Sequence, residues 1–179
     1  MRRFKRPNTE ETSRGGDDKT TEVAAVRLLL RREHSTKDLK RKLQGKGHDA
    51  GTVERVVEKL SDKKLVSDER FASSFVSHHG RRGQGPIRIR AELRQQGATD
   101  EAINAALAGA EFDWGEIATA VRRRKFGDDL PSSRAERAKQ ARFLQYRGFS
   151  TDHIKAAMAS IAVDPAEPAL LDSDFDESN

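Results

Sequence analysis

Arginine and lysine side chains are the groups in this sequence whose number and spacing could do chemistry, and that chemistry is contact with phosphate or carboxylate. A basic helical surface attracts a phosphate backbone, with an affinity that falls as the salt concentration rises. For any single residue a solvated helix face is the commoner explanation, but the middle of the three basic stretches is dense enough to indicate a binding surface. These stretches hold Lys37, Lys40, Arg41, Lys42 and Lys46; Arg81, Arg82, Arg88, Arg90 and Arg94; and Arg122, Arg123, Arg124, Lys125, Arg134, Arg137, Lys139, Arg142 and Arg147.

Other kinds of chemistry find little support in the sequence. The chain has no cysteine, which excludes disulfides and thiolate metal sites, and its five scattered histidines lack the i, i+4 spacing of a zinc site. Residues 80–86, Gly-Arg-Arg-Gly-Gln-Gly-Pro, lack the Lys-Ser/Thr ending of a phosphate loop and follow no strand, so we expect a mobile cationic linker there. We therefore predict no enzyme activity, no cofactor and no metal site.

The net charge of +5 hides an asymmetry along the chain. Residues 164–179 carry six acidic and no basic side chains, so residues 1–163 alone carry +11. This tail combines two prolines with an acidic run, which predicts disorder, and the basic segment 1–21 is predicted to be disordered as well. The acidic tail is either a solubilising end or an intramolecular mimic of nucleic acid that competes for the basic body.

Residues 22–163 show helical periodicity and almost no strand pattern. A stripe of Val23, Val26, Leu29 and Leu30 predicts the apolar face of a first helix, and Ser35 or Thr36 starts a second. The pattern then repeats at intervals of 50 and 51 residues. The positions that align are Leu39, Leu43, Gly47, Val53 and Val57; Ile89, Leu93, Gly97, Ile103 and Leu107; and Leu144, Gly148, Ile154 and Met158.

The repeated glycines predict the turns between helices, because glycine adopts the positive φ that ends a helix. Pro86 suits a first helical position, while Thr99 and Ser150 can cap. The third copy places Gln140 where the second has Ile89, so we expect Ala138 and Ala141 to supply its apolar face.

The predicted fold is all-α and elongated, with three tandem three-helix repeats at residues 22–66, 67–110 and 111–163 between disordered termini. Each repeat is short of large apolar side chains, so neighbouring repeats should bury part of each other's surface. A three-helix unit of this kind is similar to a helix-turn-helix. Its last helices, however, offer only residues such as Asn104, Thr151 and His153 for base contacts, which disfavours sequence-specific DNA recognition.

Three ordered stretches resemble the RecX family of regulatory proteins. Residues 32–43, Arg-Glu-His-Ser-Thr-Lys-Asp-Leu-Lys-Arg-Lys-Leu, followed by Gly47, resemble its opening. Residues 65–72, Leu-Val-Ser-Asp-Glu-Arg-Phe-Ala, are similar to its most distinctive motif, with Val66 and Ser67 in place of a Leu and an Asp. Residues 85–93, Gly-Pro-Ile-Arg-Ile-Arg-Ala-Glu-Leu, with the later Gly97, match its third segment. The resemblance covers residues 22–163 and is weakest in the third repeat.

The resemblance implies three three-helix repeats and a function that composition does not supply. RecX proteins bind the RecA recombinase and the RecA–single-stranded-DNA filament and inhibit its ATPase, strand-exchange and co-protease activities, in the regulation of DNA repair, recombination and the SOS response. The resemblance leaves open whether the protein caps filament ends, blocks the groove or displaces DNA. The alternative is a nucleic-acid-binding module that acts without RecA and without sequence preference.

We predict that basic side chains bind this partner, with contacts to single- or double-stranded DNA phosphates as a further expectation. Arg70 has a competing structural role, pairing with Asp68 or Glu69 at the junction between repeats. We also expect a monomer in the cytoplasm, since no apolar run approaches the roughly 20 residues of a membrane span and no signal peptide is recognisable. The candidate residues are Arg81, Arg82, Arg88 and Arg90, followed by Arg70, Arg122, Arg123 and Arg124.

Overall fold

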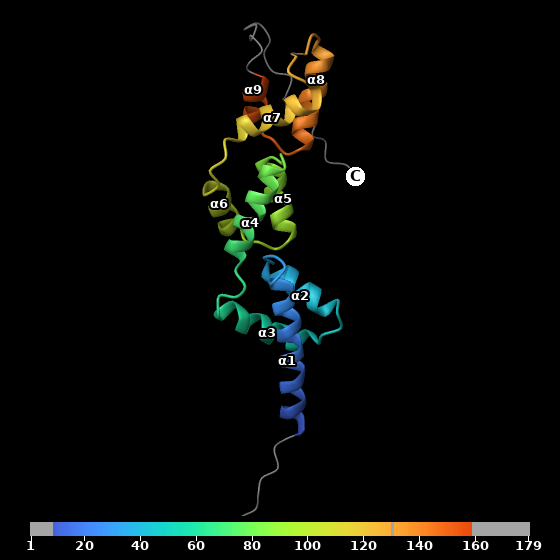
Figure 1. The fold of residues 1–179 in the computed structure, drawn as a ribbon, viewed down its shortest axis with the longest axis vertical. Helices are drawn as coiled ribbons and strands as arrows, with labels where there is room; N and C mark the ends of the chain where they lie inside the picture. The colour runs from blue at the N-terminus through green and yellow to red at the C-terminus, as the bar shows by residue number, and fades with distance from the viewer. Residues whose placement is uncertain (1–8, 130, 159–179) are drawn as a thin grey trace, which may run out of the picture. The chain divides into compact units, whose positions relative to one another are not determined.

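The computed structural model describes residues 9–129 and 131–158. Over these ranges the chain forms nine α-helices and no strand, which confirms the predicted all-α fold (Figure 1). None of the helices in this part of the chain has both the length and the apolar character that crossing a membrane requires. The helices are α1 (Thr9–Leu29), α2 (Thr36–Gln44), α3 (Ala50–Asp62), α4 (Asp68–Arg81), α5 (Pro86–Gln95), α6 (Asp100–Ala108), α7 (Trp114–Phe126), α8 (Arg134–Tyr146) and α9 (Thr151–Met158).

The described residues fall into two compact units. The first comprises residues 9–77 and 90–110, and the second comprises residues 78–89, 111–129 and 131–158. Helices α4 and α5 each contribute residues to both units. The acidic tail 164–179 and the first eight residues, both predicted to be disordered, lie outside the described residues.

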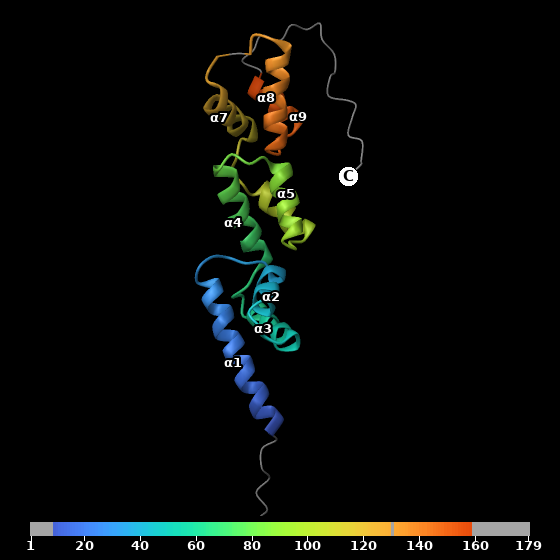
Figure 2. The same cartoon turned by 90° about the vertical axis from the view of Figure 1, so that its right-hand side faces the viewer.

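Helices α1, α2 and α3 pack together in the first unit, side by side in both views (Figures 1 and 2). Their shared core contains Ala25, Leu39, Leu43, Val53 and Leu60, all fully buried. The predicted apolar stripe of the first helix is confirmed only at Leu29, which packs on this core, while Val23, Val26 and Leu30 are exposed. The buried face of α1 instead carries Thr21 and Ala25 with the half-buried Leu28, since small side chains allow α1 to approach α2 and α3 closely.

Residues 9–21, predicted to be disordered, form the first half of α1. Polar contacts of Asp18, Thr21 and Glu22 hold the middle of α1 to α3 and to the α2–α3 loop. Asp18 pairs with Arg55 at 2.8 Å, Glu22 pairs with Lys59 at 2.8 Å, and Thr21 shares a hydrogen bond with His48. Composition alone missed the helix because these partners lie far along the sequence.

Helices α7, α8 and α9 pack together in the second unit around Ala118, Leu144, Phe149 and Ile154. Gln140 of α8 is 6 % exposed, and its Oε1 has no hydrogen-bond partner among the described residues. Ala141 packs on this core as predicted, but Ala138 is exposed. The expectation for Ala138 was wrong because the aliphatic part of Gln140 itself occupies the position of Ile89 in the repeat.

The repeated glycines have the predicted conformation and place the helices of each repeat. Gly47, Gly97 and Gly148 have φ values of 90°, 87° and 88°. In each case the amide of the next residue donates to the carbonyl of the leucine four positions before the glycine, at 3.1–3.2 Å. These are the bonds that close a helix on a left-handed glycine.

The predicted helix starts are confirmed as well. Pro86 is the first residue of α5. The hydroxyl oxygens of Ser35, Thr99 and Ser150 accept the amides of Asp38, Ala102 and His153, three residues further on.

Candidate partner-binding surface

The predicted arginines differ in how far they face the solvent. Arg122 is only 1 % exposed, because it lies on the packed face of α7 with Ala118 and Val121. Its Nη1 donates to the Asp129 carbonyl at 3.4 Å, while its Nε has no hydrogen-bond partner among the described residues. Arg122 therefore lies on the packed face of α7, whereas Arg123 and Arg124 beside it are exposed.

Arg70 is occupied by contacts within the first unit. Its Nε donates to the Glu33 carboxylate at 3.1 Å, and its two terminal nitrogens donate to the carbonyls of Lys64 and Leu65. These bonds tie the α3–α4 loop to the segment before α2. The expected structural role is present, but the carboxylate partner is Glu33 rather than Asp68 or Glu69.

The cluster from Arg81 to Arg90 is divided between the two units. Arg90 belongs to the first unit, where its Nη1 donates to Asn104 at 2.6 Å. Arg81, Arg82 and Arg88 belong to the second unit together with Arg123 and Arg124.

The glycine-rich segment between α4 and α5 is an ordered turn, not the mobile linker predicted. The Gly85 amide donates to the Arg147 carbonyl at 2.8 Å, and the Ile87 amide donates to the Gly148 carbonyl at 3.0 Å. The Arg147 guanidinium in turn donates to the carbonyls of Gly83 and Arg82, at 3.3 Å and 3.5 Å. A Cβ on Gly85 would lie 2.2 Å from the Gly148 carbonyl oxygen, so only glycine permits this approach.

Four arginines converge where these two turns meet. They line a pocket of about 550 Å³ in the second unit, and none of the described residues that line it is acidic. The lining comes from the end of α4 and the turn after it, from α5, from α7 and from the end of α8. The residues are His79, Arg82, Gln84, Arg88, Arg124, Tyr146 and Arg147.

Two aromatic rings accompany this positive charge. The Arg88 guanidinium lies 5.7 Å from the ring centroid of Tyr146, a residue that is 80 % exposed. Arg147 lies 5.3 Å from the ring centroid of Phe143 on α8. Both distances are within the range of a cation–π interaction, which orients a guanidinium without neutralising it.

Arg81 and Arg123 are exposed but are not among the residues that line the pocket. The Arg123 side chain pairs with Asp128 at 3.6 Å. Of the eight predicted residues, Arg82, Arg88 and Arg124 are therefore the ones that the structure brings together.

Sequence reasoning missed Tyr146 and the role of Arg147. Tyr146 is the one tyrosine of the chain, and Arg147 directly precedes the repeated Gly148. Their place beside the repeat glycine was visible, but their partners sixty residues earlier were not. As for metals, no group of three or more His, Cys, Asp or Glu side chains converges in the described part of the chain.

Comparison with known proteins assigns a family to all three repeats. Residues 23–60, 67–107 and 115–158 match the first, second and third three-helix domains of RecX. The chain is 47 % identical over 146 residues to "Regulatory protein RecX" of Halorhodospira halophila, covering 82 % of this chain and 91 % of that protein. It is 41 % identical over 140 residues to the protein of the same name from Pseudomonas fluorescens, covering 78 % and 90 %.

The chain belongs to the RecX family. Solved structures agree in fold: the crystal structure of RecX from Lactobacillus salivarius superposes with a TM-score of 0.68 at 22 % identity, covering 82 % of this chain and 97 % of that one. A second RecX crystal structure gives a TM-score of 0.72 at 20 % identity, covering 89 % and 81 %.

Two of the three RecX-like stretches meet in the first unit, where they join the first and second domains. The Thr36 amide donates to Asp68 at 2.8 Å, and Ser67 caps α4 by accepting the Arg70 amide. Ser35 donates to the Gln96 carbonyl at 2.6 Å, next to Gly97. Substitution of Ser67 for the usual acid therefore preserves the cap, as predicted, and these stretches act in joining the domains.

Proposed function

We propose that this chain binds RecA and the RecA–single-stranded-DNA filament and inhibits the ATPase, strand-exchange and co-protease activities of RecA. As a member of the RecX family it is a regulatory protein, and the inhibition is our extension of that assignment. The observation that carries the proposal is the match of three RecX domains in order over residues 23–158.

The distribution of charge supports an acidic partner. Arg82, Arg88 and Arg124 gather at a pocket that no described acidic residue lines, whereas Arg81 and Arg123 add exposed charge elsewhere in the same unit. A filament repeats its binding surface at every protomer, so weak contacts from linked domains add up to strong binding.

In this proposal the protein acts by binding and not by catalysis. The protein acts as a monomer in the cytoplasm, without a cofactor and without catalysing a reaction, through three domains at residues 22–66, 67–110 and 111–163. Inhibition in this scheme comes from occupying the filament.

Titration into RecA assembled on single-stranded DNA tests the proposal. ATP hydrolysis should fall at fewer than one molecule per RecA protomer, because one inhibitor spans or ends a run of protomers. Unchanged hydrolysis across a hundredfold range of ratios contradicts the proposal.

Recovery of RecA separates the proposal from nucleic-acid binding without RecA. After nuclease digestion of all DNA, the immobilised chain should still retain purified RecA. Retention that disappears with the DNA favours the RecA-independent alternative.

A further inference from the structure

We propose that the arginine pocket of the second unit binds one nucleotide of a single-stranded nucleic acid, with its phosphate on the arginines and its base stacked on Tyr146. The inference deepens the proposed function and rests on it where the strand is the one carried by RecA. The site itself can be tested without RecA.

Guanidinium groups are dense around this pocket. Arg82, Arg88, Arg124 and Arg147 come from four separate segments and line one pocket of about 550 Å³, a size typical of small-ligand sites. Guanidinium groups match a phosphate with two parallel donors, and their charge stays at any physiological pH. With no described acidic residue in the lining, an anion is the ligand that this pocket favours.

Contacts around the pocket fix the segments that carry these arginines. Arg147 is held by the carbonyls of Arg82 and Gly83 and by the ring of Phe143. The Arg88 backbone packs directly against Gly148, where an added Cβ would lie 2.3 Å from the Arg88 Cβ. Two further lining residues are joined to each other, because His79 Nδ1 donates to the Gln84 side-chain oxygen. A preformed site costs little ordering entropy when the ligand binds.

Tyr146 distinguishes between the classes of anion that the pocket could bind. Tyr146 lines the pocket and is 80 % exposed, whereas an aromatic residue of the core would be covered. An unpaired base stacks on such a ring, whatever its sequence. The acidic side chains of a peptide gain nothing from the ring, and in a duplex the bases are already stacked on each other. The combination of arginines and an exposed ring therefore favours a single strand.

Fluorescence anisotropy with a labelled oligothymidylate, at fixed salt and without RecA, tests the site. Tyr146→Ala should weaken binding about tenfold, while Tyr146→Phe, which keeps the ring, should bind as the unaltered chain does. An abasic oligonucleotide of equal length should bind the unaltered chain and Tyr146→Ala equally. Because Tyr146 is exposed, neither substitution should change the thermal unfolding midpoint.

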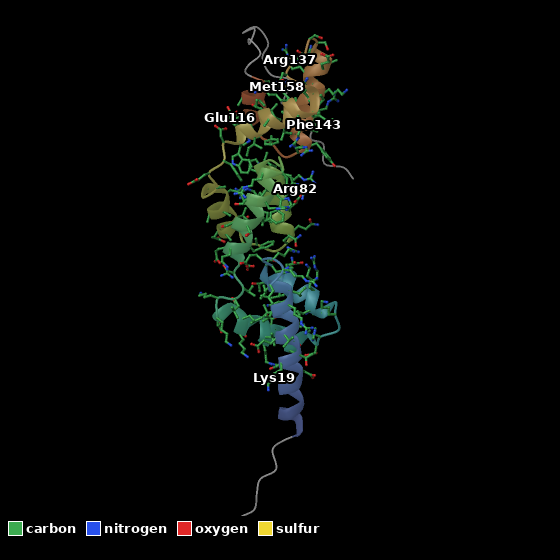
Figure 3. The ribbon with its side chains drawn as sticks, viewed as in Figure 1. Lys19, Arg82, Glu116, Arg137, Phe143 and Met158 are labelled. Atoms are coloured by element: carbon green, nitrogen blue, oxygen red, sulfur yellow. The ribbon has the colours of Figure 1, made fainter. Side chains whose placement is uncertain are left out.

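Arg82→Gln and Arg124→Gln should each weaken the binding of both the oligothymidylate and the abasic oligonucleotide. Each should also reduce the salt dependence of binding by about one phosphate contact. Arg137→Gln is the matched control, because Arg137 is an exposed arginine of α8 that does not line the pocket (Figure 3). It should bind as the unaltered chain does.

Three results overturn the inference. Tyr146→Ala could bind oligothymidylate as the unaltered chain does, or Arg137→Gln and Arg124→Gln could lose equal affinity for it. The third is that polyglutamate displaces the labelled probe as well as unlabelled oligothymidylate does. The last result assigns the pocket to an acidic protein segment. If the oligonucleotide results hold but RecA ATPase is unaffected, the proposed function fails and the nucleotide site stands. If the variants bind DNA normally and RecA is inhibited, the reverse is true.

Discussion

His34 and Asp38 form a buried polar pair at the start of α2. Asp38 is 3 % exposed, and its carboxylate accepts a hydrogen bond from His34 Nδ1 at 2.7 Å. It also forms ion pairs with Arg41 and Lys42, one turn further along α2. Because a carboxylate only accepts, His34 Nδ1 carries the hydrogen. Burial alone would raise the pKa of Asp38, but its hydrogen bonds with His34 and Arg41 and the charge of Lys42 hold that pKa below its usual value.

The same pair predicts how stability depends on pH. Burial lowers the pKa of His34 below its usual 6.5, against the opposing effect of Asp38. On acidification the unfolded chain therefore protonates His34 at a higher pH than the folded chain does. The contribution of neutral His34 to the free energy of unfolding is complete above pH 6.5 and declines below it, by at most about 1.4 kcal/mol per pH unit. The Asp38 contribution, with a pKa lowered from 3.8, declines only in stronger acid.

Urea unfolding at pH 7.5 and pH 5.0 measures this effect. The unaltered chain should lose free energy of unfolding on acidification, and His34→Gln should lose less. His78→Gln, which removes an exposed histidine, should behave as the unaltered chain does. An equal loss in His34→Gln and the unaltered chain contradicts the assignment.

At the scale of helices and turns, each unit contains the same kind of contact, in which a repeat glycine packs against the first turn of a helix from the preceding repeat. In the first, the α5–α6 turn meets the first turn of α2, where a Cβ on Gly97 would lie 2.7 Å from the Lys37 Cβ. In the second, the α8–α9 turn meets the first turn of α5, where Gly148 faces Arg88. A repeat glycine thus serves both the turn within its repeat and the approach of the neighbouring repeat.

Alanine substitutions separate these two roles. Gly47→Ala meets backbone strain alone, since nothing lies within 4 Å of its Cβ position, and should cost about 1–3 kcal/mol. Gly148→Ala adds a collision with Arg88 and should cost about 1–3 kcal/mol more. Gly85→Ala, without a positive φ, tests close approach alone. Chemical denaturation gives the free energies of unfolding, and equal losses for Gly47→Ala and Gly148→Ala would refute the double role.

The turns and caps could be predicted from the sequence because they depend on a few neighbouring residues. Gly97 and Thr99 show this, since each acts on groups within a few positions of itself. The buried face of α1, the burial of Arg122 and the helix at residues 9–21 depend on contacts with distant segments. So does the pocket, because Arg82 and Arg147 meet across 65 positions. The sequence therefore predicted most of the repeat architecture but only part of the site.

At the scale of the whole molecule, charge is divided between a basic body and an acidic tail. Residues 1–163 carry +11 and residues 164–179 carry −6, so the tail is an anion tethered to a surface that attracts anions. A tethered competitor acts at a high effective concentration and lowers the affinity for an external one.

Deletion of residues 164–179 should therefore tighten binding to nucleic acid and to the RecA filament, most clearly at low salt where charges are least screened. Anisotropy titrations at 50 mM and 300 mM NaCl measure the affinity for nucleic acid and the affinity for the RecA filament. A matched variant with the six acids replaced by their amides should behave as the deletion does. Equal affinities with and without the tail would identify it as a solubilising end.

Inhibition of RecA ATPase by the chain and by two charge-reversed forms tests most directly whether this chain inhibits RecA through the arginine pocket. The account predicts strong inhibition by the unaltered chain, and by Arg137→Glu, which reverses an exposed charge away from the pocket. The double variant Arg82→Glu, Arg124→Glu should need at least about tenfold more protein, because two phosphate-binding charges become repulsive. Inhibition by the double variant at the same concentration as the unaltered chain would contradict the account.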